Sequence, residues 1–89
     1  MYDIDWNEDK NNKLKQDRGI GFEDVVLAMS EKRILADIPH YNQKKYKKQK
    51  ILILEINNYA YVVPYVIEGE KMFLKTIYPS RTATKLYLN

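Results

Sequence analysis

Apolar and polar residues alternate with different periods along the chain, and each period predicts an element. Tyr2, Ile4 and Trp6 alternate with acidic residues, which predicts a short half-buried strand. The polar stretch over residues 7–18 predicts a surface helix, with Asn7 as its cap and Gly19 as its stop. A second helix is predicted from residue 22 to about residue 30, because its apolar residues share one helical face: Phe22, Val25, Val26 and Met29.

From residue 33 onward the pattern changes to that of strands. Runs rich in β-branched and aromatic residues predict strands at RILADI (33–38), ILILEI (51–56), YAYVVPYVI (59–67) and KMFLKTIY (71–78). Turns predicted at 57–58 and 68–70 would join the last three strands into an antiparallel meander. Pro64 is out of place in a strand with partners on both sides, so we expect a β-bulge there. Ser80 is a suitable cap for a short helix that ends at Leu88.

Together these elements predict one α+β domain over residues 1–89. It would be an antiparallel meander sheet with two N-terminal helices packed on one face and a short C-terminal helix. Beneath the two helices we expect Leu52, Leu54, Ile56, Ala60, Val62 and Val66. The opposite face would carry Ile51, Ile53, Tyr61, Val63, Tyr65, Ile67, Phe73, Lys75 and Ile77. That face is too apolar to be left in water. Either the chain's own loops and third helix cover it, or a partner does. We expect an oligomer or a protein partner.

Composition narrows the class of protein. A chain of 89 residues with 45% apolar residues can form one domain with a small core. The lack of cysteine excludes disulfides and thiolate metal sites, and a single histidine argues against an imidazole metal centre, so we expect no cofactor. No apolar run is long enough to span a membrane, and the acidic N-terminus does not look like a signal peptide. These features predict a cytoplasmic protein that does not enter a membrane.

The net charge of +3 is unevenly distributed. Residues 1–37 carry nine acids and six basic residues, whereas residues 38–89 carry three acids and nine basic residues. A basic second half favours an anionic partner such as nucleic acid. The run HYNQKKYKKQK (40–50) holds five of these cations: Lys44, Lys45, Lys47, Lys48 and Lys50. Such a run is either a solvated loop or a long-range attractor of polyanions; we expect attraction, detectable as salt-sensitive binding.

Arg81 is the strongest candidate for direct contact with a phosphate. It falls in the first turn of the helix capped by Ser80, where backbone amides attract anions and a guanidinium fork matches phosphate oxygens. The alternative is an ion pair between Arg81 and a nearby carboxylate. Lys85, one turn later, could add charge. Lys75 either extends to water from the second face or marks a binding surface there.

The tyrosines and the remaining basic residues complete the candidate site. Tyr61 and Tyr65 could act as stacking platforms for unpaired bases, although most tyrosines serve in packing. The sequence has no P-loop, glycine-rich nucleotide motif, paired carboxylates or metal-ligand cluster. One reaction needs none of these, which is cleavage of RNA by its own 2′-hydroxyl group. In such a site Arg81 would stabilise the phosphate and Lys75 and Lys50 would add charge, while protons would pass through Tyr46, Tyr65 or His40.

Three local patterns resemble a known family. IDWNEDK (4–10) with Gly19 and then FEDV (22–25) is similar to the N-terminal pattern of BrnT-type toxins, and PSRTAT (79–84) resembles their arginine-bearing C-terminal segment. The resemblance implies a RelE-like fold, a ribonuclease toxin of a type II toxin–antitoxin module, and a DNA-binding antitoxin as partner, in a homodimer or a heterotetramer with the antitoxin. In this resemblance Arg81 matches the family's arginine and Lys10 the lysine after the tryptophan motif.

The chain differs from the family pattern at three positions. Arg18, Thr76 and Thr82 stand where members often carry a histidine, an arginine and a second arginine. Two functions therefore remain open beside the ribonuclease: a non-catalytic protein-interaction module that keeps the toxin fold, and a small nucleic-acid-binding protein. Growth arrest with RNA cleavage would identify the ribonuclease. Tight, salt-dependent binding without cleavage would identify the nucleic-acid-binding protein.

Overall fold

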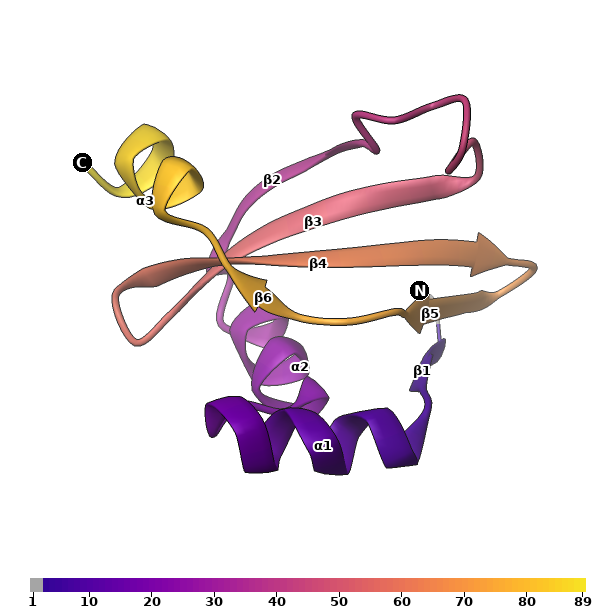
Figure 1. The fold of residues 1–89 in the computed structure, drawn as a ribbon, viewed down its shortest axis with the longest axis horizontal. Helices are drawn as coiled ribbons and strands as arrows, with labels where there is room; N and C mark the ends of the chain where they lie inside the picture. Colours follow the sequence, from indigo (N-terminus) through magenta and orange to yellow (C-terminus); the bar gives the residue numbers. More distant parts are fainter. Residues whose placement is uncertain (1–2) are drawn as a thin grey trace.

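Three helices and a mixed six-stranded sheet make up the computed structural model, which describes residues 3–89 (Figure 1). Tyr2, expected in the first strand, therefore lies outside the described residues. The elements in chain order are β1 (Asp3–Trp6), α1 (Glu8–Arg18), α2 (Phe22–Ser30), β2 (Ile34–Pro39), β3 (Gln49–Ile56), β4 (Tyr59–Glu68), β5 (Lys71–Leu74), β6 (Tyr78–Pro79) and α3 (Arg81–Leu88). The α+β class is thereby confirmed.

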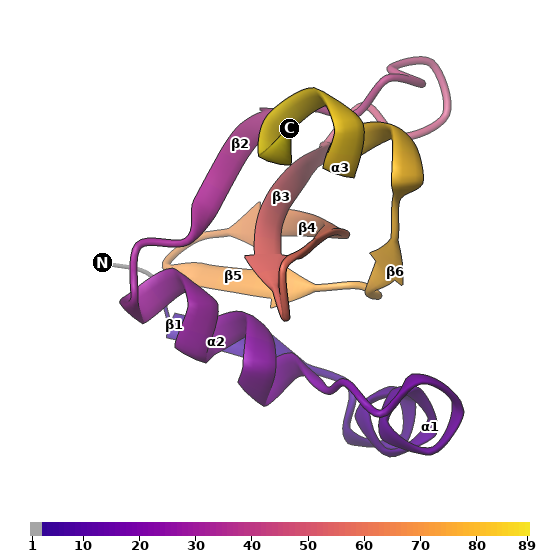
Figure 2. The ribbon, with the colours of Figure 1, turned by 90° about the vertical axis from the view of Figure 1, so that its left-hand side faces the viewer.

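The sheet has the order β1-β5-β4-β3-β2, with β6 paired to β4 beside the end of β5. Strands β2 to β5 pair antiparallel, as the meander predicts, but β1 pairs parallel to β5. The expectation of a purely antiparallel sheet is therefore wrong at this edge. Figures 1 and 2 show α1 and α2 on one side of the sheet and α3 on the other. We call these sides the helix-side face and the second face. Among residues 3–89, no helix is both long and apolar enough to cross a lipid bilayer.

The first helix begins and ends where its caps predict, and α2 spans the predicted residues Phe22–Ser30. The Asn7 side chain accepts a hydrogen bond from the Lys10 amide at 3.0 Å, and Gly19 ends α1 with φ +69°. In α2, Phe22, Val25 and Ala28 are buried against the sheet.

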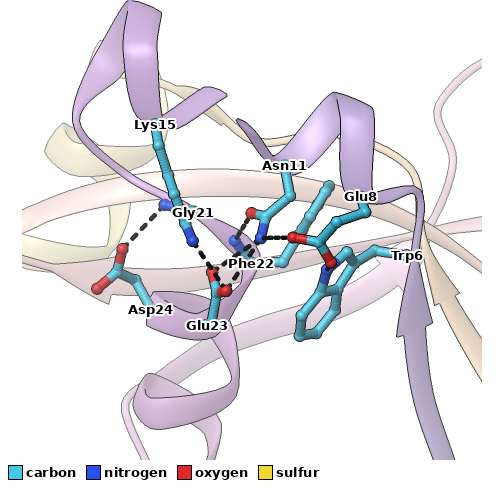
Figure 3. Close-up of polar contacts among 8 residues, drawn as sticks. All are labelled: Trp6, Glu8, Asn11, Lys15, Gly21, Phe22, Glu23 and Asp24. Atoms are coloured by element: carbon cyan, nitrogen blue, oxygen red, sulfur yellow. Dashed lines mark hydrogen bonds and ion pairs between the residues drawn. The ribbon is translucent and has the colours of Figure 1, made fainter. Parts of the chain in front are cut away.

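A polar cluster joins α1 to α2 (Figure 3). Asn11, which is fully buried, accepts a hydrogen bond from the Phe22 amide at 2.7 Å and donates to the carboxylates of Glu8 and Glu23. Lys15 approaches Glu23 at 2.9 Å. The hydrogen bonds from Asn11 and Lys15 lower the pKa of Glu23 from its ordinary value of 4.5 to about 2. Because these polar groups bind one another, the mostly polar helix α1 can dock with only Asn11 and Leu14 buried.

Two apolar clusters lie on opposite faces of the sheet. The helix-side core contains residues of both helices and of the sheet: Leu14, Phe22, Val25, Leu52, Leu54, Ile56, Val63, Tyr65, Met72, Leu74 and Ile77, among others. The second core contains Ile51, Ile53, Ala60, Val62 and Ala83, with Tyr78, Tyr87 and Leu88 packed against it. The helix α3 therefore covers part of the second face with the chain's own residues.

The predicted faces of β4 are reversed in the structure. The two-residue turn Asn57-Asn58, with φ of 55° and 63°, pairs Ile56 with Tyr59. Directly paired residues point to the same face, so the odd-numbered residues of β4 join Leu52 and Leu54. Tyr61, Val63, Tyr65 and Ile77 thus pack on the helix-side core, whereas Ala60 and Val62 belong to the second core.

The predicted strand over 71–78 is broken, and the break explains Pro64. Tyr65 of β4 pairs with Leu74 of β5, and Val62 of β4 pairs with Tyr78 of β6. Between these two pairs, β4 has two residues (63–64), whereas the segment that joins β5 to β6 has three (75–77). The Pro64 carbonyl accepts from the Lys75 amide at 2.8 Å, so its ring nitrogen, which has no hydrogen, faces this same break. Pairing of β3 with β4 is continuous through Pro64, so the expected bulge lies not in β4 itself but in the facing segment 75–77, which has one extra residue.

Candidate functional site

A groove on the second face is the larger of two grooves that we describe. Its volume is about 320 Å³, and it lies between α3, the end of β2 and the middle of the sheet. Aliphatic residues form most of its wall: Ile38, Ile51, Ile53, Val62, Ala83 and Leu86. Three tyrosines, Tyr41, Tyr78 and Tyr87, and the residues Ser80 and Thr82 complete the lining. We call it the α3 groove.

Two tyrosine hydroxyl groups meet in the α3 groove. The Tyr41 and Tyr78 oxygens lie 3.3 Å apart, although Tyr41 is 77% exposed and belongs to a separate loop. Partial burial, together with the hydrogen bond to Tyr41, raises the pKa of Tyr78 to about 12. Tyr78 therefore keeps its proton at neutral pH, so it can donate a proton or a hydrogen bond to a bound group.

Arg81 lies beside this groove as the first residue of α3. The helix start is capped as predicted, since the Ser80 hydroxyl accepts from the Ala83 amide at 3.0 Å. Arg81 is exposed, and its guanidinium forms no ion pair with any carboxylate of residues 3–89. Lys85 lies four residues later and is exposed on the same side of the helix. Both cations are thus available to an anion.

The lysine run forms an exposed loop that His40 organises. His40 is buried between the rings of Tyr41 and Tyr46, at centroid distances of 4.6 and 4.5 Å. Its Nδ1 accepts a hydrogen bond from the Asn42 amide at 3.0 Å, and its carbonyl accepts one from Gln43. The lysines of the loop point to solvent: Lys44, Lys45, Lys47 and Lys48. His40 and Tyr46 therefore hold the loop in shape, and Tyr41 connects it to the α3 groove.

Lys50 and Tyr65 lie on the helix-side face, away from Arg81. Tyr65 is only 3% exposed, and its hydroxyl donates to Asp37 at 2.6 Å. Lys50 approaches the same carboxylate oxygen at 3.6 Å. A second groove of about 280 Å³ borders this trio and is lined also by Met29, Ile34, Leu52, Ile67 and Met72. The structure thus separates two residues that the sequence suggested would act with Arg81.

The other candidates are also dispersed. Tyr61 packs on the helix-side core and against the edge of Tyr59, at 6.0 Å between centroids. Lys10 is exposed in the first turn of α1, on the opposite side of the sheet from α3 (Figure 2). Lys75 is exposed at the break after β5, with its ammonium 5.3 Å from the Phe73 ring centroid. Of the candidates, Arg81 and Lys85 therefore lie together on α3, and the lysine loop is linked to this side of the sheet through Tyr41.

Sequence reasoning missed the groove itself. Ile38, Tyr41 and Leu86 are exposed apolar residues on its lining, and none was a candidate. Leu86 alone could have suggested an apolar binding surface, because it is an apolar residue in a helix that was expected to be short. Tyr41 and Tyr78 carried none, because they are 37 positions apart and meet only through the sheet.

Most of the segments that line the α3 groove carry no negative charge of their own. Residues 38–54 and 71–89, which contribute the loop, most of β3 and α3, contain no acidic residue. Glu55, the next residue of β3, pairs with Ala60 on the second face and forms an ion pair with Arg33. Among residues 3–89, no three His, Cys, Asp or Glu side chains are close enough together to hold a metal ion. Comparison of the chain with models of known protein families, with curated proteins and with solved structures gave no significant match.

Proposed function

We propose that this chain is the toxin component of a type II toxin–antitoxin module and cleaves RNA as a metal-independent endoribonuclease with a RelE-like fold. The observation that carries the proposal is Arg81. It is an exposed guanidinium without an ion pair among residues 3–89, at the capped start of α3 and beside a groove whose lining contains no acid. The sequence resemblance to BrnT-type toxins supports the same function through the same arginine.

The reaction uses the nucleophile of the substrate. The 2′-oxygen of one nucleotide bonds to the adjacent phosphorus as its proton leaves to a base. The bond from phosphorus to the 5′-oxygen breaks, and that oxygen takes up a proton. The products are a 2′,3′-cyclic phosphate and a 5′-hydroxyl. Arg81 binds the phosphate oxygens, on which negative charge builds in the transition state, and its fork can make two parallel hydrogen bonds.

Nearby residues supply attraction and a proton. Lys85 and the loop lysines draw the RNA to the second face by long-range electrostatics. Tyr78, with a pKa of about 12, is protonated at neutral pH and suits donation to the leaving 5′-oxygen rather than acceptance from the 2′-hydroxyl. A DNA-binding antitoxin is the proposed protein partner, in a homodimer or heterotetramer, and it would mask the face that holds RNA.

Induced expression in bacterial cells tests the proposal. Wild-type protein should slow growth and fragment cellular RNA, and Arg81→Ala should do neither while accumulating to the same level. Arg18→Ala, which removes an exposed arginine from α1 on the other side of the sheet, is the matched control and should remain toxic. Unimpaired toxicity of Arg81→Ala would exclude the mechanism.

A second function, a non-catalytic interaction module with the toxin fold, is favoured by the separation of the candidate residues. His40, Tyr65 and Lys50 are engaged in contacts of their own and lie apart from Arg81. Under this function the wild-type protein would neither slow growth nor alter RNA when expressed.

A further inference from the structure

The α3 groove leaves apolar side chains in contact with water. Leu86 is 69% exposed, Tyr41 77% and Ile38 38%, and all three belong to the lining. The floor beneath them is the second core, where Ile51 and Val62 are already buried. A surface of this kind gains free energy when a further apolar group covers it.

The size of the groove fits side chains rather than a whole domain. Its volume of about 320 Å³ is roughly twice the ~150 Å³ cavity that accepts one benzene ring. Two aliphatic or aromatic side chains of an incoming segment would therefore fill it. Because most of the wall is hydrocarbon, the floor of the groove suits apolar side chains better than the polar edges of a nucleobase.

The charge around the groove selects the occupant. Arg81 and Lys85 neighbour the lining residues of α3, and the lysine loop begins at Tyr41. No acid occurs in residues 38–54 or 71–89. A second copy of the chain that docked through the same face would bring the same cations to the interface, so like charges would meet. A segment that carries acidic residues beside its apolar ones would instead meet complementary charge.

We infer that the α3 groove is the docking site for an amphipathic protein segment that places two apolar side chains in the groove and acidic residues against Arg81, Lys85 and the loop lysines. This inference rests on the proposed function in one respect, since it assigns the segment to the neutralising partner. The segment and RNA use the same cations, so their binding is mutually exclusive. Neutralisation then needs no conformational change in the chain.

Fluorescence anisotropy with synthetic peptides tests the docking site directly. One labelled helical peptide carries two leucines one turn apart with flanking glutamates; a second replaces the leucines by serine, and a third replaces the glutamates by lysine. The purified protein should bind the first peptide saturably and the other two more weakly. Leu86→Asp should weaken binding of the first peptide by about tenfold to a hundredfold, as expected when one buried leucine is removed from an apolar interface.

Leu27→Asp is the matched control, because Leu27 is 51% exposed on α2, on the opposite side of the sheet, and its replacement should leave peptide binding unchanged. A single-stranded DNA oligonucleotide, which lacks the 2′-hydroxyl, should be displaced by the glutamate–leucine peptide.

Equal binding of all three peptides, or no saturable binding, would overturn the inference. So would light scattering that shows a dimer split by Leu86→Asp, since the occupant would then be a second copy. None of these readouts requires RNA cleavage, so a failed docking site and a failed ribonuclease are distinguishable.

Discussion

Asn11 is the polar side chain on which the junction between α1 and α2 depends. It is fully buried and accepts the hydrogen bond of the Phe22 amide, which lies in the first turn of α2 and so has no partner within the helix. Asn11→Ala should lower the free energy of unfolding by about 1–3 kcal/mol, because it leaves that amide buried and unpaired. Urea denaturation measures the change. Asn12→Ala, at an exposed neighbour, should stay within about 0.5 kcal/mol of the wild type, and equal effects of the two would contradict this role.

Glu23 makes stability depend on acidic pH. Its pKa falls from 4.5 to about 2 on folding, so the native state holds the charged form more strongly than the unfolded chain does. The resulting stabilisation is fully present above pH 4.5 and is lost as the pH falls toward 2. Glu23→Gln should therefore flatten the pH dependence of urea denaturation between these values. Glu68→Gln, at an exposed position in the β4–β5 hairpin, should leave the curve as steep as in the wild type.

Individual candidate residues show what a sequence can and cannot predict about a site. Arg81 was placed correctly at the start of a capped helix because the cap, Ser80, is its neighbour in the chain. Lys50 and Tyr65 were misplaced relative to Arg81, since their surroundings depend on Asp37, which is distant in sequence. Local signals thus located the arginine, whereas partners brought in by the sheet had no local signal.

At the scale of elements, α3 is held in place by its first turn. The Ser80 side chain caps the helix, and Thr84 donates through its hydroxyl to the Ser80 carbonyl and accepts from the Ala60 amide of β4. Ser80→Ala should destabilise the protein by about 1 kcal/mol, whereas Ser80→Asn should retain most of the stability because asparagine is also a good cap. Thermal unfolding of the two variants checks this, and equal melting temperatures would contradict the role of the cap.

The strands were predicted well as elements but less well as a sheet. Alternation and turn residues located β2, β3 and β4 to within a few positions. The faces of β4 were predicted the wrong way round. The two-residue turn Asn57-Asn58 pairs Ile56 with Tyr59, so the odd-numbered residues of β4 face the same side as the even-numbered residues of β3. The parallel pairing of β1 with β5 joins residues nearly 70 positions apart, and no feature of either strand specifies it.

At the scale of the whole molecule, charge is unevenly distributed along the chain, because residues 38–89 carry nine basic residues and three acids. The loop lysines should act together as an attractor of RNA. Replacing Lys44, Lys45, Lys47 and Lys48 by glutamine should weaken RNA binding and reduce its dependence on salt, by about 0.7 in the log–log slope for each phosphate that is no longer neutralised. Filter binding over a range of salt concentrations measures the slope. Lys10→Gln combined with Lys13→Gln, on α1, is the control, and an equal effect there would mean that RNA does not select the second face.

The α3 groove is a property of the whole molecule, which is why the sequence did not predict it. Its walls come from β2, the following loop, β3, β4, β6 and α3, and no two of these segments share a motif. The apolar second face was nevertheless predicted from the strand pattern, and α3 covers only part of it.

The central claim is that Arg81 stabilises the phosphate at which RNA is cut. Its most direct test is the rate of cleavage of a labelled RNA at saturating concentration by purified wild-type protein and by Arg81→Ala, with circular dichroism to show that both are folded. We predict a rate about 10²–10³ times lower for the variant, the usual cost of removing one group that stabilises charge in a transition state. Cleavage by folded Arg81→Ala at the wild-type rate would contradict the claim.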